Sequence, residues 1–239
     1  MSAEASEAWR MLLDSASEPY RRSGRFAWHF ARNKLRWDPV FGHLVAEGLI
    51  APRARVLDIG CGQGLLASLV RAAGLAAENG RWPQAWAPAP TGARVTGIEM
   101  MARDVARARD ALGDGAEFIC ADMRDAVFPD ADTIVILDVL HYVPFDEQNA
   151  VLARVRAALG HGGRLVLRVG DAASRSRFLS SQWVDRIVTS VRGHRVRPRY
   201  GRTIAEWQAR LAQLGFEVSS RPMHAGTPFA NILLVGTVA

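Results

Sequence analysis

Apolar runs of strand length alternate with segments whose apolar residues recur at helical spacing between residues 53 and 169. Residues 55–59, Arg-Val-Leu-Asp-Ile, form the first short run, and residues 64–73 carry leucines and a valine at helical spacing before Gly74. Alternating strands and helices predict a parallel sheet with right-handed crossovers. Further strands are predicted at residues 93–98, 117–120, 133–137 and 164–169, and further helices at residues 102–112 and at 146–159, where Gly160 closes the helix.

The C-terminal part of the chain departs from this alternation. Thr203 and Glu206 have the spacing of a capping box at the start of a helix predicted at residues 204–214. Two strands, at residues 216–220 and 231–238, follow with no helix between them, and such strands normally pair antiparallel. The expected fold class is therefore α/β, a Rossmann-like, doubly wound sheet of seven strands that is mostly parallel with an antiparallel C-terminal hairpin.

Two segments lie outside the alternation. Residues 1–52 have a mostly helical pattern and precede the first strand. Residues 77–92 are rich in proline and tryptophan, and they predict an inserted loop between the first helix and the second strand. The expected organisation is an N-terminal helical segment at 1–52 and an α/β domain at 53–239.

Composition adds few constraints. A chain of 239 residues with 49% hydrophobic and 23% charged residues is ordinary for one globular α/β domain. Cys61 and Cys120 are too few for a disulfide framework and give no metal-ligand spacing, so no metal is expected and a reducing, cytoplasmic location fits best. The N-terminus lacks the apolar core of a signal peptide, and no apolar run has the length of a membrane-spanning helix.

The net charge of +6 is compatible with a nucleic acid, an anionic membrane or an acidic protein as partner. Arginine supplies almost all of the positive charge, because Lys34 is the only lysine. GC-rich coding alone also produces arginine enrichment. The charge by itself therefore selects no partner.

The most informative stretch is Val-Leu-Asp-Ile-Gly-Cys-Gly-Gln-Gly at residues 56–64, where a predicted strand runs into three alternating glycines and then a helix. Gly60 and Gly62 permit backbone angles and close approaches that a Cβ would block, so a ligand can lie against bare backbone at the end of the strand. This pattern resembles the first motif of class I S-adenosylmethionine-dependent methyltransferases. A dinucleotide site would instead need the spacing G-x-G-x-x-G. Asp58 would also repel a pyrophosphate, whereas it suits the ammonium of the cofactor's methionine part.

The resemblance covers roughly residues 53–239 and implies a set of cofactor-binding residues. Glu99 matches the acidic residue that binds both ribose hydroxyls, and Asp122 matches the one that meets the adenine amino group, with Met123 beside the ring. Taken alone, either carboxylate would equally be a solvated strand end. Asp138 falls in the family's active-site motif. The expected residues for S-adenosylmethionine and its product S-adenosylhomocysteine are Asp58, Gly60, Cys61, Gly62, Gly64, Glu99, Met100, Asp122, Met123 and Asp138.

His141 and Tyr142 are the candidate catalytic residues. His141 follows the fourth strand and titrates near neutrality, so it can serve as a base for a hydroxyl or carbon-acid acceptor, and Tyr142 can orient the substrate. The alternative is that His141 only packs or caps locally. The Asp138 segment lacks the Asn/Asp-Pro-Pro-aromatic motif of enzymes that methylate exocyclic or amide nitrogens, so nucleic acid is not the favoured partner.

Residues 20–37 interleave basic residues with large aromatic ones. Segments before the first strand often cover the cofactor and the substrate in this family, so the resemblance implies a helical lid at residues 1–52. A helix here would place Phe26, Phe30 and Leu35 inward and its arginines outward. The basic face then is solvated, docks an acidic carrier protein or an anionic membrane surface, or contacts nucleic acid. A second basic stretch at residues 192–202 favours an anionic partner or substrate.

Residues 20–39, followed by the glycine motif, also resemble bacterial methyltransferases of gene clusters for aryl polyene or xanthomonadin-type pigments. That resemblance implies an aromatic starter unit or a polyketide intermediate, held on an acyl carrier protein. We therefore expect methyl transfer from S-adenosylmethionine to a small or acyl-carrier-bound substrate. The alternatives are an RNA methyltransferase and a non-catalytic S-adenosylmethionine-binding protein. The expected location is cytoplasmic, with the inner membrane surface as an alternative, and no oligomeric state is predicted.

Overall fold

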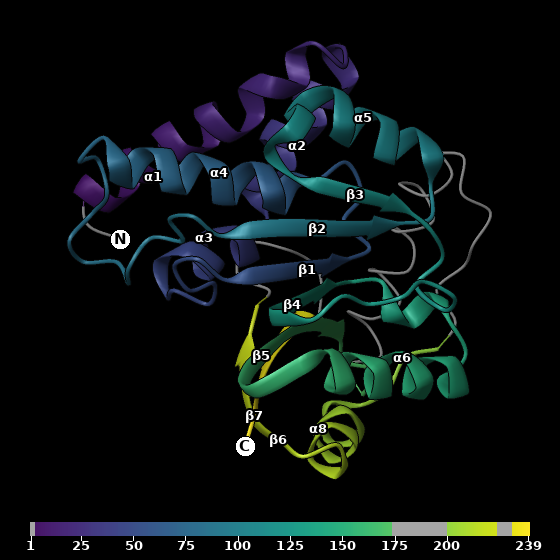
Figure 1. Cartoon of the computed structure of the whole chain (residues 1–239). Helices are drawn as coiled ribbons and strands as arrows, with labels where there is room; N and C mark the ends of the chain where they lie inside the picture. Colours follow the sequence, from purple (N-terminus) through teal and green to yellow (C-terminus); the bar gives the residue numbers. More distant parts are fainter. Residues whose placement is uncertain (1–2, 174–199, 224–230) are drawn as a thin grey trace. The chain divides into compact units, whose positions relative to one another are not determined.

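A computed structural model describes residues 3–173, 200–223 and 231–239 (Figure 1). The chain divides into two compact units, Met1–Val127 and Phe128–Ala239. Each unit has its own sheet strands and its own helices.

The first unit begins with helices, as the pattern of residues 1–52 predicts. They are α1 (Ala3–Ser17), the 3-10 turn η1 (Glu18–Arg21), α2 (Arg25–Trp37) and α3 (Pro39–Ala46). Asp38 ends α2 and begins α3, because its side chain accepts a hydrogen bond from the Val40 backbone N–H and Pro39 occupies the first turn. α1 packs against α4 (Leu65–Glu78), the helix after the first strand (Figure 1).

Three parallel strands form the sheet of the first unit in the order β3-β2-β1. They are β1 (Arg55–Ile59), β2 (Arg94–Glu99) and β3 (Glu117–Cys120), and α5 (Ala102–Leu112) connects β2 to the short turn η2 (Gly113–Gly115) before β3. The predicted strand at 117–120 and helix at 102–112 are confirmed at both ends.

The predicted end of the first helix at Gly74 is wrong, because α4 continues to Glu78. Gly74 is buried inside α4, and a Cβ there would make an ordinary van der Waals contact with the Thr91 Cα at 3.8 Å. The inserted loop therefore starts at Asn79 rather than at residue 77.

The predicted orientation of α2 is wrong in part. Its buried face consists of Ala27, Ala31 and Leu35, so Leu35 points inward as expected. Phe26 is 47% exposed and lies beside Phe30, with ring centroids 6.3 Å apart. The two alanines occupy the inward face because their small side chains allow α2 to pack closely against its neighbours.

The second unit contains a parallel pair followed by an antiparallel hairpin. β4 (Ala131–Leu137) pairs parallel with β5 (Leu159–Gly170), which pairs antiparallel with β7 (Asn231–Val238), which in turn pairs antiparallel with β6 (Phe216–Pro222). The turn η3 (Leu140–Tyr142), helix α6 (Phe145–Ala158) and helix α8 (Ile204–Gln213) complete the described part of this unit.

Local signals in the second unit are confirmed with one exception. The Thr203 hydroxyl accepts from the Glu206 N–H at 3.3 Å and the Glu206 carboxylate accepts from the Thr203 N–H at 2.7 Å, which is the predicted capping box. Gly160 does not close the preceding helix as predicted. α6 ends at Ala158 and β5 starts at Leu159, with an irregular register between Ala131 and Thr133 on the partner strand.

The strand order over the described residues is β3-β2-β1-β4-β5-β7-β6. This is the expected Rossmann-like sheet of seven strands, mostly parallel with an antiparallel C-terminal hairpin. Among the described residues, no helix combines the length and the apolar character needed to span a membrane.

Candidate functional site

The glycine turn after β1 has the backbone that only glycine adopts without strain. Gly60, Gly62 and Gly64 have φ angles of 78°, 55° and 79°. The backbone N–H groups of Gly60 and Cys61 both donate to the Ile98 carbonyl, at 2.8 and 3.1 Å, which anchors the turn on β2. A Cβ at Gly62 would have no atom within 4 Å, so this glycine lines open space. The turn therefore offers bare backbone, as the motif predicts.

Phe118 on β3 fills the space that two glycines leave. A Cβ at Gly64 would lie 2.8 Å from the Phe118 ring, and a Cβ at Gly97 would lie 2.9 Å from the ring and 2.6 Å from the Cys61 Sγ. Cys61 is buried, and burial raises the pKa of its thiol. Gly97 was not among the predicted site residues, although its place in the second strand required a reason for a glycine.

Glu99, at the end of β2, is the residue that holds the glycine turn. Its Oε2 accepts from the Gly62 N–H at 3.0 Å and its Oε1 accepts from the Met101 N–H at 2.9 Å. Each carboxylate oxygen has a second acceptor position, so Glu99 retains the capacity to bind two further donors. The structure thus brings Glu99 together with the glycine turn, across the inserted loop that separates them in sequence.

Asp58 is buried directly before the turn. Burial, and secondarily the charge of Glu99, raise its pKa to about 7. A buried carboxylate with a second carboxylate nearby favours a cationic ligand, because such a ligand would offset both charges.

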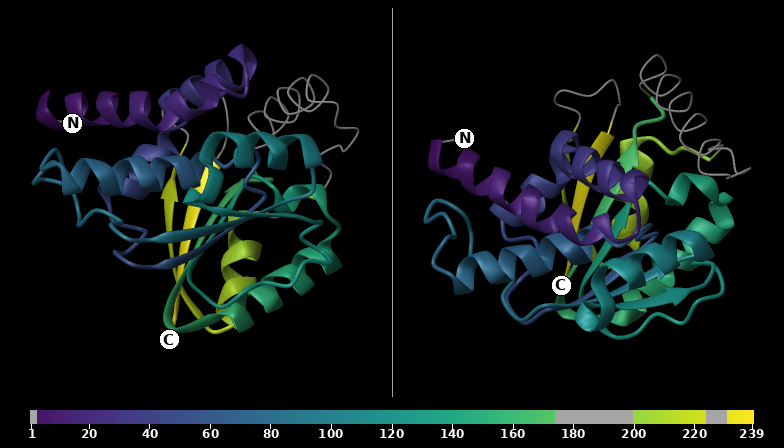
Figure 2. Two further views of the ribbon diagram at one scale, coloured as in Figure 1. Left: turned by 45° about the horizontal axis from the view of Figure 1, so that its top comes forward. Right: turned by 90° about the horizontal axis from the view of Figure 1, so that it is seen from above.

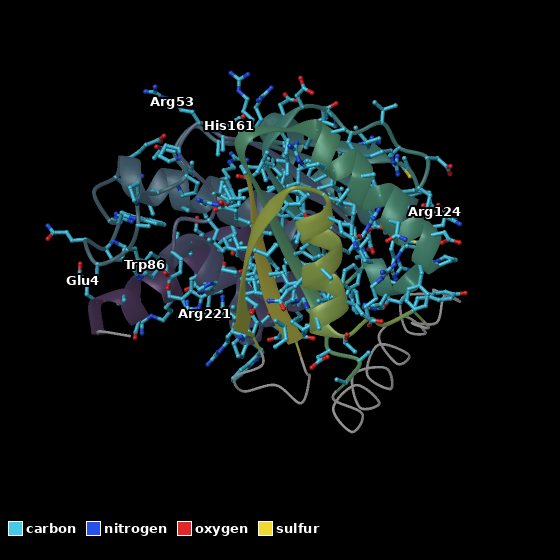
Figure 3. All side chains as sticks on the ribbon, turned by 90° about the horizontal axis from the view of Figure 1, so that it is seen from below. Glu4, Arg53, Trp86, Arg124, His161 and Arg221 are labelled. Atoms are coloured by element: carbon cyan, nitrogen blue, oxygen red, sulfur yellow. The ribbon has the colours of Figure 1, made fainter. Side chains whose placement is uncertain are left out.

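Asp122 lies after β3, where the motif places it, but its carboxylate already has a partner. The guanidinium of Arg124 contacts both carboxylate oxygens, with Nη2–Oδ2 at 2.7 Å, and these hydrogen bonds lower the Asp122 pKa. Arg124 is exposed (Figure 3). Met123 is half-buried and Met100 is 50% exposed, so Met100 presents apolar surface beside the turn without packing in the core.

The N-terminal helices are hydrogen-bonded to the glycine turn, a feature that the sequence analysis did not detect. The buried Tyr20 hydroxyl donates to the Gln63 carbonyl at 2.9 Å, and the Gln63 amide donates to the Ala27 carbonyl at 3.0 Å. One turn further on, the Ser68 hydroxyl donates to the Ala16 carbonyl at 2.7 Å. Gln63 thus lies between two of the motif glycines and contacts both η1 and α2.

In the second unit, Asp138 directly follows β4 and has a strained backbone conformation. Its φ is 60°, in the left-handed region that non-glycine residues rarely adopt. Both of its carboxylate oxygens bind the guanidinium of Arg168, with Nε–Oδ1 at 2.9 Å, and its N–H donates to the Arg168 carbonyl at 3.1 Å. The Arg168 side chain is only 1% exposed. Arg168 therefore needs Asp138 as a counter-charge, and the pair fixes the backbone turn.

His141 and Tyr142 follow on η3 with their ring centroids 4.3 Å apart. Burial lowers the His141 pKa, and the nearby Asp138 opposes this change. His141 is therefore neutral near pH 7 and can accept a proton. Both side chains are half-buried.

The side chain of Gln148 on α6 holds the backbone of η3 through hydrogen bonds. Its buried amide nitrogen lies 3.1 Å from the carbonyl oxygens of Leu140 and Val143 and 2.9 Å from that of Tyr200, so its two hydrogens are shared among three acceptors. Its side-chain oxygen accepts from Arg202 Nε at 2.8 Å, and the Tyr200 N–H donates to the His141 carbonyl at 3.3 Å. No local sequence motif marks Gln148 or Arg168, because each acts on residues distant in the chain.

The predicted residues thus fall into two groups. The first unit brings together the glycine turn, Asp58, Glu99 and Cys61, and it carries Met100, Asp122 and Met123 on the loops after β2 and β3. The second unit brings Asp138, His141 and Tyr142 together on one short segment after β4. Of the second basic stretch, residues 192–199 lie outside the described residues.

Comparison with known proteins identifies the sequence family. Residues 27–220 match a family described as "Methyltransferase domain". Among curated proteins, the chain is 32% identical over 140 residues to a carboxy-S-adenosyl-L-methionine synthase of Chromohalobacter salexigens, a match over 54% of this chain and 47% of the relative. The chain thus spans about half the length of the curated relatives it matches.

Solved structures show the same fold. The magnesium protoporphyrin IX methyltransferase of Synechocystis, solved with bound S-adenosylhomocysteine, is 22% identical, with a TM-score of 0.58 and coverage of 93% of this chain and 94% of that one. An O-methyltransferase family protein of Burkholderia thailandensis is 18% identical, with a TM-score of 0.64 over 88% of this chain and 57% of that chain.

Proposed function

The chain belongs to the methyltransferase-domain family and has the fold of class I S-adenosylmethionine-dependent methyltransferases, and from this premise we propose that it transfers the methyl group of S-adenosylmethionine to a small-molecule acceptor. The observation that carries the proposal is the contact between Glu99 and the Gly62 N–H, beside the buried Asp58. This places two carboxylates and bare backbone at the carboxyl ends of the neighbouring parallel strands β1 and β2.

The cofactor of this family, S-adenosylmethionine, fits the charges of the turn. It carries a positive sulfonium and an ammonium, and such a cation would stabilise the charged form of the buried Asp58, whose pKa burial raises to about 7. We propose that Asp58, Cys61 and the three glycines hold the methionine part, and that Glu99 and Met100 hold the ribose. The bound cofactor supplies an activated methyl group.

Asp122 and Met123 are proposed to bind the adenine. Because Arg124 contacts both Asp122 oxygens, an adenine amino group must share these oxygens with Arg124 or displace it. The Asp122 carboxylate has the acceptor capacity to do the first, since each oxygen can accept two hydrogen bonds.

The second unit is proposed to supply the acceptor side of the reaction. Neutral His141 would take the proton of a hydroxyl or carbon-acid acceptor, and Tyr142 would orient it. The Asp138 carboxylate is bound to Arg168, so we propose that Asp138 contributes through the position of its backbone rather than as a base. The residues of the chain would align the acceptor with the methyl group and exclude water.

Ion pairs within the N-terminal helices affect which kind of partner these helices attract. Four of their cations contact carboxylates of the same segment, namely Arg10–Glu7, Arg21–Glu18, Arg32–Asp14 and Lys34–Asp38. This pairing reduces the positive field that an acidic carrier protein, an anionic membrane surface or RNA would recognise. It supports a small acceptor, with the carrier-bound acceptor as the alternative, and a role of residues 1–52 as a cover for the site.

The experiment incubates the protein with S-adenosylmethionine and a panel of phenolic, carboxylic, carrier-linked and RNA acceptors, and follows cofactor and acceptor by mass spectrometry. The proposal requires S-adenosylhomocysteine together with a methylated acceptor. Detection of carboxy-S-adenosyl-L-methionine would instead indicate the activity for which the curated relatives are named. Cofactor binding with no turnover on any acceptor, RNA included, would indicate a binding protein.

Variants separate the roles in the active protein. His141→Gln should lower the rate for a hydroxyl acceptor by about 100-fold or more while cofactor affinity stays unchanged. Tyr142→Phe should raise KM more than it lowers kcat if Tyr142 orients the acceptor. His161→Gln, which changes a histidine of the β5 register irregularity, is the matched control and should leave the rate unchanged.

A further inference from the structure

A cavity of about 340 Å³ lies between α1 and α2, away from every residue proposed to hold the cofactor in the first unit. The two helices pack against each other in the N-terminal segment (Figure 2). The volume of the cavity is at the lower end of the range for small-ligand sites. It is lined by Ser6, Trp9, Arg10, Leu13 and Asp14 of α1 and by Arg32, Arg36 and Trp37 of α2.

One wall of the cavity is apolar and aromatic. Trp9 packs on α3, where a Cβ at Gly42 would lie 3.7 Å from its ring, and Leu13 is buried beside it. Trp37 closes the α2 side and is 67% exposed. An indole with two thirds of its surface in water is a costly arrangement in a folded protein, and exposed tryptophans beside arginines recur at binding sites.

The charges of the cavity distinguish its three arginines. Arg32 is paired with Asp14, and Arg10 lies 3.5 Å from Glu7. Arg36 contacts no carboxylate in the described part of the chain, and its guanidinium lies over the Trp37 ring, 5.0 Å from the centroid. Arg36 is thus one cation without a counter-charge at the rim of an apolar wall.

We propose that this cavity binds an amphipathic monocarboxylate, with the apolar chain or ring against Trp9, Leu13 and Trp37 and the carboxylate on Arg36. The planar guanidinium presents two parallel N–H groups to a carboxylate. Arg32 and Arg10 already contact carboxylates, so a ligand with one negative charge matches the cation that remains, Arg36. The cation over the indole also keeps Trp37 in place for the apolar part.

The test uses octanoate as the probe and the full-length protein without S-adenosylmethionine, so that its result is independent of the proposed methyl transfer. Calorimetric titration should show saturable binding at one site per chain. Arg36→Gln should weaken octanoate binding by about tenfold or more, the loss of one charge-assisted contact. Trp37→Ala should weaken it too, because the apolar wall is removed.

Two controls decide between a built site and general surface binding. Arg25→Gln removes the same charge from the same helix at an exposed residue outside the cavity, and should leave octanoate affinity unchanged. Octanol, which lacks the carboxylate, should bind the native protein at least about tenfold more weakly than octanoate and should not distinguish Arg36→Gln. Equal affinity for octanol and octanoate, equal losses in both arginine variants, or no saturable binding would each overturn the proposal.

Discussion

Asp58 connects the stability of the protein to its cofactor. Its pKa is raised to about 7 in the folded protein, against a value near 4 in an unfolded chain. Between these pH values the folded state holds a proton that the unfolded state has released. The contribution of this group to stability is therefore complete below about pH 4 and is lost as the pH rises through about 7.

Asp58→Asn should remove this pH dependence. Thermal unfolding without cofactor should show that the native protein loses stability between about pH 4 and pH 7 with a slope of at most about 1.4 kcal/mol per pH unit from Asp58, and that the variant loses less. Asp114→Asn, at an exposed carboxylate of η2, should behave like the native protein. Identical pH profiles for native protein and Asp58→Asn would contradict the assigned charge state. The variant should also bind S-adenosylmethionine more weakly.

Gly62 and Gly64 differ in what a side chain would meet. Gly64→Ala should destabilise the protein by about 1–3 kcal/mol, because the new Cβ would lie 2.8 Å from the buried Phe118 ring at a φ of 79°. Gly62→Ala should cost only about 1 kcal/mol of backbone strain, because its Cβ points into open space, yet it should weaken cofactor binding more. Urea unfolding and cofactor titration of both variants measure the two effects. A larger stability loss for Gly62→Ala would contradict this account.

At the scale of elements, η1 and α2 contact the glycine turn through Tyr20 and Gln63. Tyr20→Phe removes the hydroxyl that donates to the Gln63 carbonyl and leaves that buried acceptor without this donor, which should cost about 1–3 kcal/mol of stability. It should also weaken S-adenosylmethionine binding, because Gln63 stands between Gly62 and Gly64. Ser17→Ala is the comparator, since it removes a buried hydroxyl that donates to the Asp14 carbonyl within α1 rather than to the turn. Equal effects of both variants on affinity would show that the turn is not involved.

Gln148 should prove necessary for the shape of η3. Gln148→Leu removes the donor of three backbone carbonyls and the acceptor of Arg202, so urea unfolding should show a loss of about 2–4 kcal/mol. Gln213→Leu, exposed at the end of α8 in the same unit, should change stability by less than about 0.5 kcal/mol. A loss at Gln148 no larger than this control would contradict the role proposed for its amide.

Elements with strong local signals could be predicted from the sequence, and glycines were misread where tertiary contacts decide. The helix at 102–112 and the capping box at Thr203 depend on neighbours within one or two turns, and both are confirmed. Gly74 has the sequence appearance of a helix end, but it is buried inside α4, which continues to Glu78. Phe26 was placed inward by hydrophobicity, whereas packing selected the small Ala27 and Ala31.

The candidate site was predictable where a motif encodes it and invisible where it depends on distant partners. The glycine turn and Glu99 follow from a family pattern, and the structure brings them into contact. Arg168, Gln148 and Tyr20 carry no local signature, because their partners are 30, 8 and 43 residues away in sequence. The ion pair between Asp122 and Arg124 can be predicted from the sequence, because an arginine two residues after an aspartate suggests one.

At the scale of the whole molecule, the family and the fold are established while the acceptor is a proposal. The family match extends over residues 27–220 and therefore includes most of each compact unit. Fold similarity to proteins that are 18% and 22% identical does not identify the substrate of this chain. The net charge of +6 likewise selects no partner, because a nucleic acid, an anionic membrane and an acidic protein would each be attracted by it.

The most direct test is calorimetric titration of the native protein and of Glu99→Gln with S-adenosylmethionine, with Glu117→Gln as a control on the neighbouring strand. The account predicts saturable binding, weakened about tenfold or more in Glu99→Gln because a charge-assisted acceptor is lost, and unchanged in Glu117→Gln. Absence of binding by folded native protein, or equal affinity in native protein and Glu99→Gln, would contradict the assignment of this turn as the cofactor site.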